Sequence, residues 1–277
     1  MTRLSSADIA GIPERLTDYE RELRSRIGCG LLGLAGHTLG LAERELAERL
    51  RGVRAAVVPM DSGLGVIEGF AEAVRSIASH LGCDAFVTRR ADVGGLAEAY
   101  AQGAGLLLAA DDRDFVAVNL KSRRVADNSA STARGYAAAL DLLCGGVRGR
   151  PVLVLGCGPV GRHALRALAA RGALLAAHDP KRERVQAAKA ELSGAAGAPL
   201  RVEQDLEQAL LRHELIFDAT PAPAFIRERH IGANTCVSAP GVPLGLDPAA
   251  LRAIGARLVH DPLQIGVAVM LAEAAAG

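Results

Sequence analysis

The chain has 277 residues, with 32 Lys and Arg against 31 Asp and Glu, and a formal net charge of +1. A chain of this length is expected to form about two domains. The balanced charge and an aromatic content of 3% argue against a nucleic-acid-binding protein, which needs a basic excess or stacking aromatic side chains. No apolar run approaches the ~20 residues that span a bilayer, and residues 1–19 mix Arg, Asp and Glu, unlike a secretory signal. We therefore expect a cytoplasmic protein that binds neither nucleic acid nor membrane.

The cysteines are scattered, at Cys29, Cys83, Cys144, Cys157 and Cys236. No two of them form a C-x-x-C pair, and the sequence has no H-E-x-x-H motif. An odd, scattered set argues against a disulfide framework and against a zinc site. We expect five free, buried thiols in a reducing compartment and no metal.

The first half of the chain begins with a helical stretch, residues 5–50, and then alternates short apolar runs with amphipathic segments. The predicted strands and helices follow each other at 55–60, 69–81, 85–88, 95–102, 106–110 and 131–143. Residues 115–125 fit a strand with a polar continuation. Repeated strand–helix–strand units of this size predict a parallel sheet covered on both faces.

Residues 145–150, rich in Gly and Arg, have no periodicity and predict a linker. The alternation resumes with strands and helices at 152–155, 161–171, 174–177, 184–192, 215–218, 237–238, 248–254, 257–259 and 264–276. We predict an α/β protein in which an N-terminal α/β substrate domain with leading helices (1–149) precedes a C-terminal Rossmann dinucleotide-binding domain (150–277). We expect the active site to lie between the two domains. The last helix is a candidate to pack back against the first domain.

The sharpest motif is a glycine-rich turn that directly follows an apolar strand and opens a helix. In this G-x-G-x-x-G pattern Gly156 permits the tight turn, Gly158 lets the backbone approach a pyrophosphate, and Gly161 lets helix and strand pack closely. Pro159 and Val160 begin the helix, whose N-terminus offers free N–H groups to phosphates. The context predicts a dinucleotide site.

Asp179 ends the next strand, where the dinucleotide fingerprint expects an acid. A carboxylate at this position accepts hydrogen bonds from ribose hydroxyls and repels a 2′-phosphate, which favours NAD over NADP. Lys181 and Arg182 follow closely and leave that preference open.

Two further loops follow strands of the same sheet and should lie on the same rim, because ligands bind outside the carboxyl ends of parallel strands. One contains Thr220 and Pro221, and the other contains Pro240 and Gly241. We expect them to reach the ribose and nicotinamide, although simple turn chemistry also accounts for Pro and Gly there.

Polar clusters in the first half predict the substrate side. Ser62 and Gly63 lie in a glycine-rich turn after a strand, where a capped turn is an equally good explanation. Asp111 and Asp112 follow another strand, and a carboxylate pair there would suit a cationic substrate and accept its proton. Amides at Asn119 and near 128 would fix a substrate by hydrogen bonds or form Asx-turns.

Six blocks, in this order, resemble the PylD family of pyrrolysine synthases over nearly the whole chain. They are VPMDSGLGVIEGFAEAV (58–74), AADDRDFVAVNLKSRRVADN (109–128), VLVLGCGPVG (152–161), FDATP (217–221), SAPGVP (238–243) and DPLQIGVAVML (261–271). The resemblance implies an NAD-dependent amine dehydrogenase that acts on a small dipeptide-like substrate, 3-methyl-D-ornithyl-Nε-L-lysine. Oxidation of its terminal amine and cyclisation to the pyrroline ring, with release of ammonia and water, form the last step of pyrrolysine biosynthesis.

The resemblance also implies roles for the residues of the ADD block. Asp111 would hold and deprotonate the reacting amine, because an ammonium has no lone pair with which to expel a hydride. Asp112, Asn119 and Asn128 would orient the substrate.

Other matched positions imply further contacts. Ser62 and Gly63 would meet the polar end of the substrate, and Leu4 begins an N-terminal helix that covers the site in this family and excludes water. Asp261 stands where the family has Glu, so the carboxylate is kept with a shorter reach. Asp61 and Leu64 replace Thr and Asn of the family pattern.

A shikimate-dehydrogenase-like NAD(P) oxidoreductase is the nearest alternative, since that group has the same domain order. Its usual Lys near the first strand–helix turn is missing here, because residues 59–69 contain no Lys. An NAD-sensing module without catalysis is a second alternative and would leave the acidic pair unexplained. The oligomeric state stays open, and a homodimer is one option.

Overall fold

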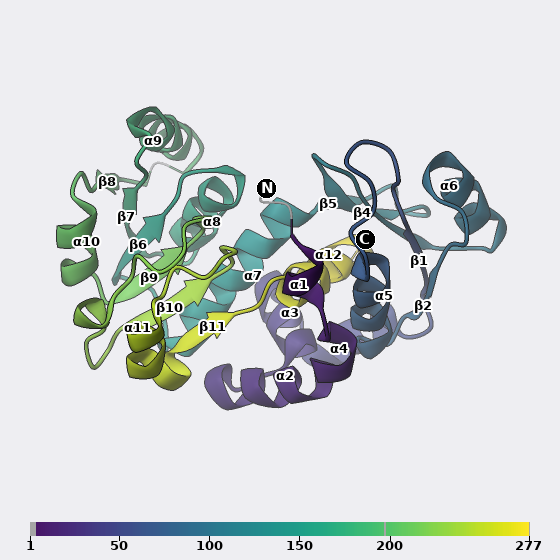
Figure 1. The fold of residues 1–277 in the computed structure, drawn as a ribbon, viewed down its shortest axis with the longest axis horizontal. Coiled ribbons are helices and arrows are strands. Elements are labelled where there is room, and N and C mark those ends of the chain that lie inside the picture. The colour runs from purple at the N-terminus through teal and green to yellow at the C-terminus, as the bar shows by residue number, and fades with distance from the viewer. Residues whose placement is uncertain (1–3, 197, 277) are drawn as a thin grey trace. The chain divides into compact units, whose positions relative to one another are not determined.

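The computed structural model of the protein describes residues 4–196 and 198–276. The chain divides into two compact units (Figure 1). We call residues 4–25, 29–135 and 262–276 the N-terminal unit, and residues 26–28 and 136–261 the Rossmann unit. This division falls inside a helix and not at the glycine-rich segment 145–150. The domain boundary expected at 149/150 stays a prediction, because a division by contacts does not show which segments fold independently.

The leading helices predicted for residues 5–50 are present, as α1 (Ser6–Ile9), α2 (Ile12–Ile27), α3 (Leu31–Leu39) and α4 (Glu43–Leu50). The start of α1 is fixed by the main-chain N–H of Ser5, which donates to the carboxylate of Asp8 over 2.7 Å. The apolar face of α3 includes Leu31 and Leu34, which are fully buried.

The sheet of the N-terminal unit contains β1 (Arg54–Val58), β2 (Asp84–Val87), β3 (Leu106–Ala110), β4 (Phe115–Asn119) and β5 (Val125–Asp127), in the order β2-β1-β3-β4-β5. Strands β1, β2 and β3 are parallel, as predicted. The expectation of a wholly parallel sheet is wrong for the rest, because β4 runs antiparallel to β3 and β5 antiparallel to β4. Short turns join these strands, and a short turn can connect only antiparallel neighbours.

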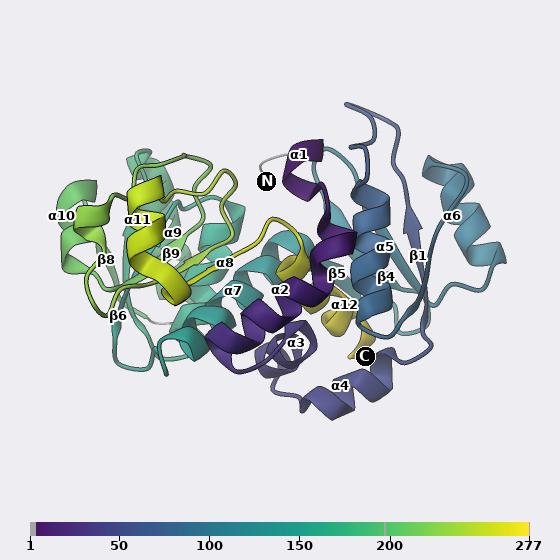
Figure 2. The same ribbon diagram turned by 60° about the horizontal axis from the view of Figure 1, so that its bottom comes forward.

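Helices cover both faces of this sheet. Figures 1 and 2 show α5 (Phe70–His80) and α6 (Asp92–Ala101) on opposite sides of β1. The last helix, α12 (Gln264–Ala275), packs against α3, α5 and β4 and is buried along almost its whole length. Its uniformly apolar sequence follows from this central place. No helix among the described residues is both long and apolar enough to span a membrane.

The Rossmann unit holds a parallel sheet of β6 (Pro151–Leu155), β7 (Leu174–His178), β8 (Leu200–Val202), β9 (Leu215–Asp218), β10 (Cys236–Ala239) and β11 (Leu258–His260). Its order is β11-β10-β9-β6-β7-β8. All the strand pairs are parallel, which confirms the predicted Rossmann fold class.

The helices of this unit are α8 (Pro159–Ala170), α9 (Arg182–Ala196), α10 (Leu206–Arg212) and α11 (Pro248–Ile254), with 3₁₀ turns at Glu228–His230 and Gly255–Arg257. One face of the sheet packs its alternating apolar residues, such as Leu153 and Val237, against α10 and α11. Helix α7 (Asn128–Leu143) belongs to both units, which meet between Gly135 and Tyr136.

Sequence reasoning missed the strands β5 and β8 and the helix α10. Strand β5 begins where the single strand expected over 115–125 was to end. Strand β8 has three residues and α10 has seven, too few for either periodicity to be recognised. The longer elements lie close to their predicted positions, and the strand at 106–110 and the helix at 248–254 are confirmed to the residue.

Candidate functional site

The glycine-rich turn has the geometry that its sequence requires. Gly156 has a φ of +84°, in the left-handed region that favours glycine. A Cβ on Gly161 would lie 1.8 Å from the carbonyl oxygen of Gly156, so no larger residue fits there. Gly158 is the N-cap residue of α8 and Pro159 its first helical residue. The free N–H groups at the start of α8 therefore open onto the turn.

A hollow of about 310 Å³ lies at this helix N-terminus and is lined by Cys157, Gly158, Pro159, Arg162, Arg184 and Ala187. Arg162 also forms an ion pair with Glu191 of α9, with its Nη1 2.8 Å from Oε1. Two guanidinium groups, one of them paired with Glu191, and a helix N-terminus are groups that favour a bound anion. Together with the room left by Gly158, these features fit the diphosphate of a dinucleotide.

Asp179 ties the end of β7 to the glycine-rich turn. Its side chain is 7% exposed, and its Oδ2 accepts a hydrogen bond from the main-chain N–H of Cys157 over 2.8 Å. Its Oδ1 accepts from the main-chain N–H of Lys181 over 2.9 Å. The acid of the fingerprint therefore holds the turn in shape. Its predicted contact with a ribose stays a prediction.

The two other predicted cofactor loops meet beside the glycine-rich turn. A Cβ on Gly241 would lie 2.2 Å from the carbonyl oxygen of Thr220, so the loops touch through their backbones. A Cβ on Gly156 would lie 3.0 Å from the carbonyl oxygen of Ala219. The structure thus brings together the loops that also contain Pro221 and Pro240, at the carboxyl ends of β6, β9 and β10.

In the N-terminal unit the structure brings Ser62, Gly63 and Asp112 together. The Oδ2 of Asp112 accepts a hydrogen bond from the main-chain N–H of Leu64 over 2.8 Å. Gly63 has a φ of +83°, and a Cβ on it would lie 2.2 Å from the same carboxylate oxygen. Glycine is therefore required at 63 both for its backbone conformation and for the close approach of Asp112.

Asp111 stands next to this contact and is exposed. Its Oδ1 accepts hydrogen bonds from the main-chain N–H groups of Asp114 and Arg113, each over 2.8 Å. These two hydrogen bonds hold the pKa of the Asp111 carboxyl below its usual value. The side chain is thus a preoriented, ionised carboxylate at the carboxyl end of β3.

Asp92, at the start of α6, is a member of this cluster that sequence reasoning missed. Its Oδ1 lies 3.0 Å from the main-chain N–H of Asp61 and 3.2 Å from the hydroxyl of Ser62, both of which donate to it. Its own N–H donates to the carbonyl of Pro59 over 2.9 Å. Its φ of 51° is unusual for a residue with a side chain. An Asp in the first turn of a helix was the available signal, but it indicates only a favourable interaction with the helix N-terminus.

The structure does not bring Asn119 to the cluster. Asn119 pairs with Leu106 at the opposite end of β3, because β4 runs antiparallel to β3. Its amide donates to the carbonyl of Ala274 over 2.9 Å, and its Oδ1 accepts from the N–H groups of Lys121 and Ser122. Asn119 therefore forms the Asx-turn that the sequence offered as the alternative. Its position gives no support to a role in substrate binding.

Asn128 begins α7 at the same edge of the sheet as Asp111, since β5 is parallel to β3. It is 8% exposed, and its Oδ1 accepts from the Thr132 hydroxyl over 3.4 Å. Helix α12 approaches closely here, because a Cβ on Gly266 would lie 2.9 Å from this Oδ1. Asn128 therefore lies at the edge of the sheet that carries Asp111, at the point where α7 and α12 approach each other.

Asp261 belongs to the Rossmann unit and is 4% exposed. Its main-chain N–H donates to the Tyr136 hydroxyl over 2.8 Å, and that hydroxyl lies 3.0 Å from Oδ2 of Asp261. Burial, followed by the charge of Asp261, raises the pKa of Tyr136 well above its ordinary value. Leu4 lies just before Ser5, the N-cap residue of α1, in the N-terminal unit and is half-buried. Substrate contacts of Leu4 and Asp261 stay predictions.

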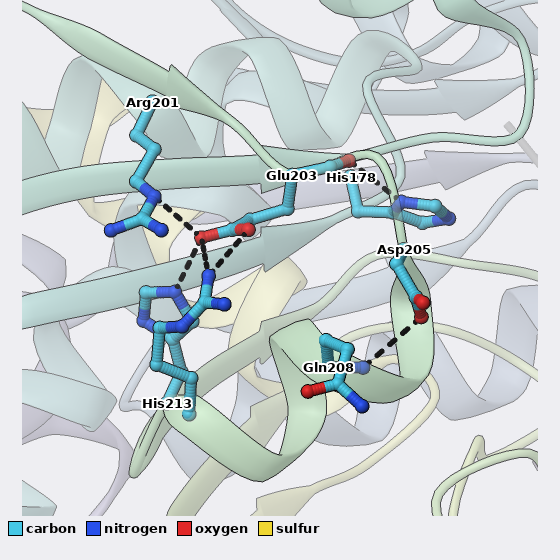
Figure 3. Close-up of polar contacts among 7 residues, drawn as sticks. His178, Arg201, Glu203, Asp205, Gln208 and His213 are labelled. Carbon is cyan, nitrogen blue, oxygen red and sulfur yellow. Dashed lines mark hydrogen bonds and ion pairs between the residues drawn. The ribbon is translucent and has the colours of Figure 1, made fainter.

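A second polar cluster surrounds Glu203, after β8 (Figure 3). Arg201, Arg212 and His213 all contact its buried carboxylate, and Nδ1 of His178 lies 3.0 Å from its carbonyl oxygen. Burial acts to raise the pKa of Glu203, but hydrogen bonds from His213 and Arg212 outweigh it and lower the pKa. The cluster holds β8 against α10 and leaves both histidines in structural contacts. In the described part of the chain no group of His, Cys, Asp and Glu side chains is arranged to hold a metal.

Comparison with known proteins decides the family. Residues 8–126 match the family model "Pyrrolysine biosynthesis protein PylD, N-terminal domain". The chain is 30% identical to the pyrrolysine synthase of Methanosarcina acetivorans over 271 residues. This alignment covers 98% of each of the two chains. The chain belongs to the PylD family. The pyrrolysine synthase of Methanosarcina barkeri is 31% identical over 218 residues, which are 79% of this chain and 80% of that protein.

Solved structures with the same fold as this PylD-family protein include dehydrogenases. Quinate dehydrogenase from Corynebacterium glutamicum in complex with NAD aligns with a TM-score of 0.55 at 15% identity, over 81% of this chain and 94% of that one. Shikimate dehydrogenase from Aquifex aeolicus aligns with a TM-score of 0.52 at 16% identity, over 77% and 88%. These alignments confirm the fold class, an α/β protein with a Rossmann unit of the shikimate-dehydrogenase kind. The PylD-family protein is thus an enzyme of pyrrolysine biosynthesis with a dehydrogenase fold.

Proposed function

We propose that this PylD-family enzyme catalyses the last step of pyrrolysine biosynthesis. It oxidises the terminal amine of 3-methyl-D-ornithyl-Nε-L-lysine with NAD, and the product cyclises to the pyrroline ring. Family membership over nearly the whole chain supports the proposal most strongly. The ionised Asp111 beside the Ser62–Gly63 turn agrees with it, because the substrate carries an ammonium group at the carbon that reacts.

In this proposal Asp111 binds the terminal ammonium, accepts its proton and passes that proton to solvent before the hydride leaves. The ordinary pKa of an alkyl ammonium is about 10.4, far above that of a carboxyl group, so the neutral amine is a minor species at pH 7. An ionised Asp111 stabilises the ammonium at the site, and the proton must leave before the lone pair can expel a hydride. We therefore expect the reaction to accelerate as pH rises towards the pKa of the bound amine.

The remaining residues of the N-terminal unit position the substrate. Asp112 and Asp92 fix the turn that contains Ser62, whose hydroxyl hydrogen is given to Asp92. The oxygen of Ser62 is left to accept an N–H of the substrate. We further propose that Leu4 covers the site, that Asn128 helps to orient the substrate, and that Asp261 contacts it.

NAD, when bound, accepts the hydride that leaves the amine carbon. We propose that the turn Gly156–Gly161 and the two arginines of the hollow bind its diphosphate, and that Asp179 binds the adenosine ribose. The loops of Thr220, Pro221, Pro240 and Gly241 would bind the nicotinamide half. A carboxylate at 179 repels a 2′-phosphate, which favours NAD over NADP.

Oxidation converts the C–NH₂ group into an imine, and the α-amine of the ornithyl part then attacks that carbon. If the imine is first hydrolysed, the water consumed is released again when the ring closes. In either case the nitrogen of the oxidised amine leaves as ammonia. Pyrrolysine is thus the substrate minus ammonia and two hydrogens.

The test is NADH absorbance with purified enzyme, NAD and the ornithyl-lysine substrate, beside the Asp111→Asn variant. The proposal predicts NADH from the unaltered enzyme and a loss of at least a hundredfold in the variant, because an amide neither binds an ammonium strongly nor accepts its proton. Shikimate and quinate serve as control substrates and are expected to give no NADH. NADH from those alcohols but not from the amine would instead support the shikimate-dehydrogenase-like function.

A further inference from the structure

Asp218 is a buried acid that the proposed reaction does not use. It ends β9 and is 0% exposed. Its Oδ1 accepts two hydrogen bonds from Thr220, one from the main-chain N–H over 3.0 Å and one from the hydroxyl over 2.7 Å. Its main-chain oxygen accepts from the N–H of Gly241 over 3.1 Å. One residue therefore contacts both loops expected to bind the nicotinamide half of the cofactor.

The second carboxyl oxygen of Asp218 faces the far end of the Gly241 loop. A Cβ on Gly245 would lie 2.2 Å from Oδ2 of Asp218. This oxygen is buried and has no hydrogen-bond partner of regular geometry among the described residues. The loop is thus packed directly against the carboxyl group, and a side chain at 245 would push it away.

A carboxyl group in this place is energetically costly. Burial raises the pKa of Asp218 to about 6, although Thr220 and the backbone of Gly245 act in the opposite direction. An apolar residue would fill the same space without the cost of burying a charged or polar group. The closest contact of the carboxyl group is with Thr220, whose hydroxyl and main-chain N–H both donate hydrogen bonds to Oδ1.

The contact with Asp218 decides what Thr220 can do. A threonine hydroxyl has one hydrogen to donate, and here that hydrogen is given to Asp218. Thr220 is itself only half-buried, so its hydroxyl oxygen is left to accept a hydrogen bond from a ligand. The same rim lies beside Gly156 of the glycine-rich turn, through Ala219.

We propose that Asp218 is a positioning residue for the cofactor, which makes the Thr220 hydroxyl an obligatory acceptor and so selects a ligand edge that donates an N–H or O–H. In a dinucleotide the donors are the nicotinamide carboxamide and the ribose hydroxyls. This inference rests on the proposed function, since it takes the nicotinamide cofactor as the ligand of this rim. Asp218 acts through Thr220 and the Gly241–Gly245 loop without touching the ligand.

The test measures NADH binding to the full chain by fluorescence titration and needs no turnover. Asp218→Ala removes the acceptor and is expected to weaken NADH binding about tenfold, the value of one lost hydrogen bond. Asp218→Asn keeps an oxygen for Thr220 and is expected to bind within about threefold of the unaltered protein. Thr220→Val should match Asp218→Ala, while Thr220→Ser should bind normally. Asp205→Asn, at the N-cap of α10 where the side chain accepts from the N–H of Gln208, is the matched control.

The double variant Asp218→Ala with Thr220→Val separates positioning from general damage. If Asp218 acts through Thr220, the double variant binds NADH no more weakly than either single variant. Additive losses, or an Asp218→Asn protein as weak as Asp218→Ala, would overturn the role of Asp218. A failure of the unaltered protein to bind NADH would overturn the proposed function as well.

A second titration shows which ligand group donates to Thr220. It uses the reduced acetylpyridine analogue of NADH, in which a methyl group replaces the carboxamide nitrogen. If the carboxamide donates to Thr220, the Thr220→Val substitution will not weaken binding of the analogue. If a ribose hydroxyl donates, the Thr220→Val substitution will weaken binding of the analogue and binding of NADH by the same factor. If the substitution weakened binding of the analogue more than binding of NADH, this would contradict the role of the Thr220 hydroxyl as a hydrogen-bond acceptor.

Discussion

The carboxylate of Asp179 accepts a hydrogen bond from the main-chain N–H of Cys157 over 2.8 Å, across the glycine-rich turn. The acid at the end of β7 therefore shapes the turn before any ligand is present. A second hydrogen bond, from the N–H of Lys181, fixes the other oxygen. In the proposed function, the ribose contact and the conformation of the glycine-rich turn would thus be linked through one side chain.

We predict that Asp179→Asn weakens NADH binding by about tenfold or more. The amide has only one oxygen for two N–H donors, so one buried donor loses its partner at a cost of roughly 1–3 kcal/mol. Fluorescence titration with NADH measures the effect, and Asp205→Asn again serves as the control. An Asp179→Asn protein with unchanged affinity would mean that the turn holds its shape without the acid.

Gly63→Ala should weaken substrate binding and lower the melting temperature. The left-handed backbone costs a residue with a Cβ roughly 1–2 kcal/mol, and the Cβ also collides with Asp112. Gly65→Ala is a close control, because Gly65 has a φ of +79° but its Cβ would come no nearer than 3.8 Å to another group.

The comparison of the two glycine variants isolates the contact with Asp112. Both carry the backbone cost, and only Gly63→Ala displaces the carboxylate. We expect the KM for the ornithyl-lysine substrate to rise more in Gly63→Ala than in Gly65→Ala, with similar melting temperatures. Equal KM values in the two variants would show that the place of Asp112 is unimportant for binding.

The buried Asp218 should make stability fall as pH rises. Its pKa is about 6 in the folded protein against an ordinary value of 3.8, so the folded state prefers the protonated form. The stabilisation from this group is therefore present below pH 3.8 and is lost as pH rises through about 6. The loss approaches about 3 kcal/mol, from a difference of about two pKa units.

Asp218→Asn removes this titration. The free energy of unfolding of the variant, relative to the unaltered protein, should increase by up to about 3 kcal/mol between pH 4 and pH 7.5. Urea unfolding at a series of pH values measures the difference. A constant difference over this range would show that Asp218 titrates normally.

The rate of the proposed reaction should rise with pH from 6 to 9. The N–H groups of Asp114 and Arg113 hold the pKa of Asp111 below its ordinary value, so Asp111 stays ionised throughout this range. The group that titrates is then the substrate ammonium, which must lose its proton before the hydride leaves. A plateau of kcat/KM that begins below pH 6 would contradict this account.

Much of the Rossmann unit could be predicted from the sequence, because Gly156, Gly158 and Asp179 occur in a strand–turn–helix context with few alternatives. The loops of Thr220 and Gly241 followed from the rule that ligands bind at the carboxyl ends of parallel strands. The carboxylates after β3 followed from the same rule.

Three residues show where sequence reasoning stops. The position of Asn119 could not be predicted, because a strand's direction depends on the turn that precedes it, and the apolar pattern is the same in either direction. Asp92 and Asp218 were missed because their importance lies in contacts with distant loops. A buried acid and an exposed acid look alike in a sequence, and only the fold distinguishes them.

The most direct test of the central claim uses ornithyl-lysine substrate with two deuterium atoms on the terminal amine carbon, incubated with enzyme and NAD and followed by mass spectrometry. The account predicts that one deuterium appears in the reduced cofactor. The product should keep the other deuterium and should have lost the terminal nitrogen as ammonia. Reduced cofactor without deuterium, or a product that retains every nitrogen of the substrate, would contradict oxidation at this carbon.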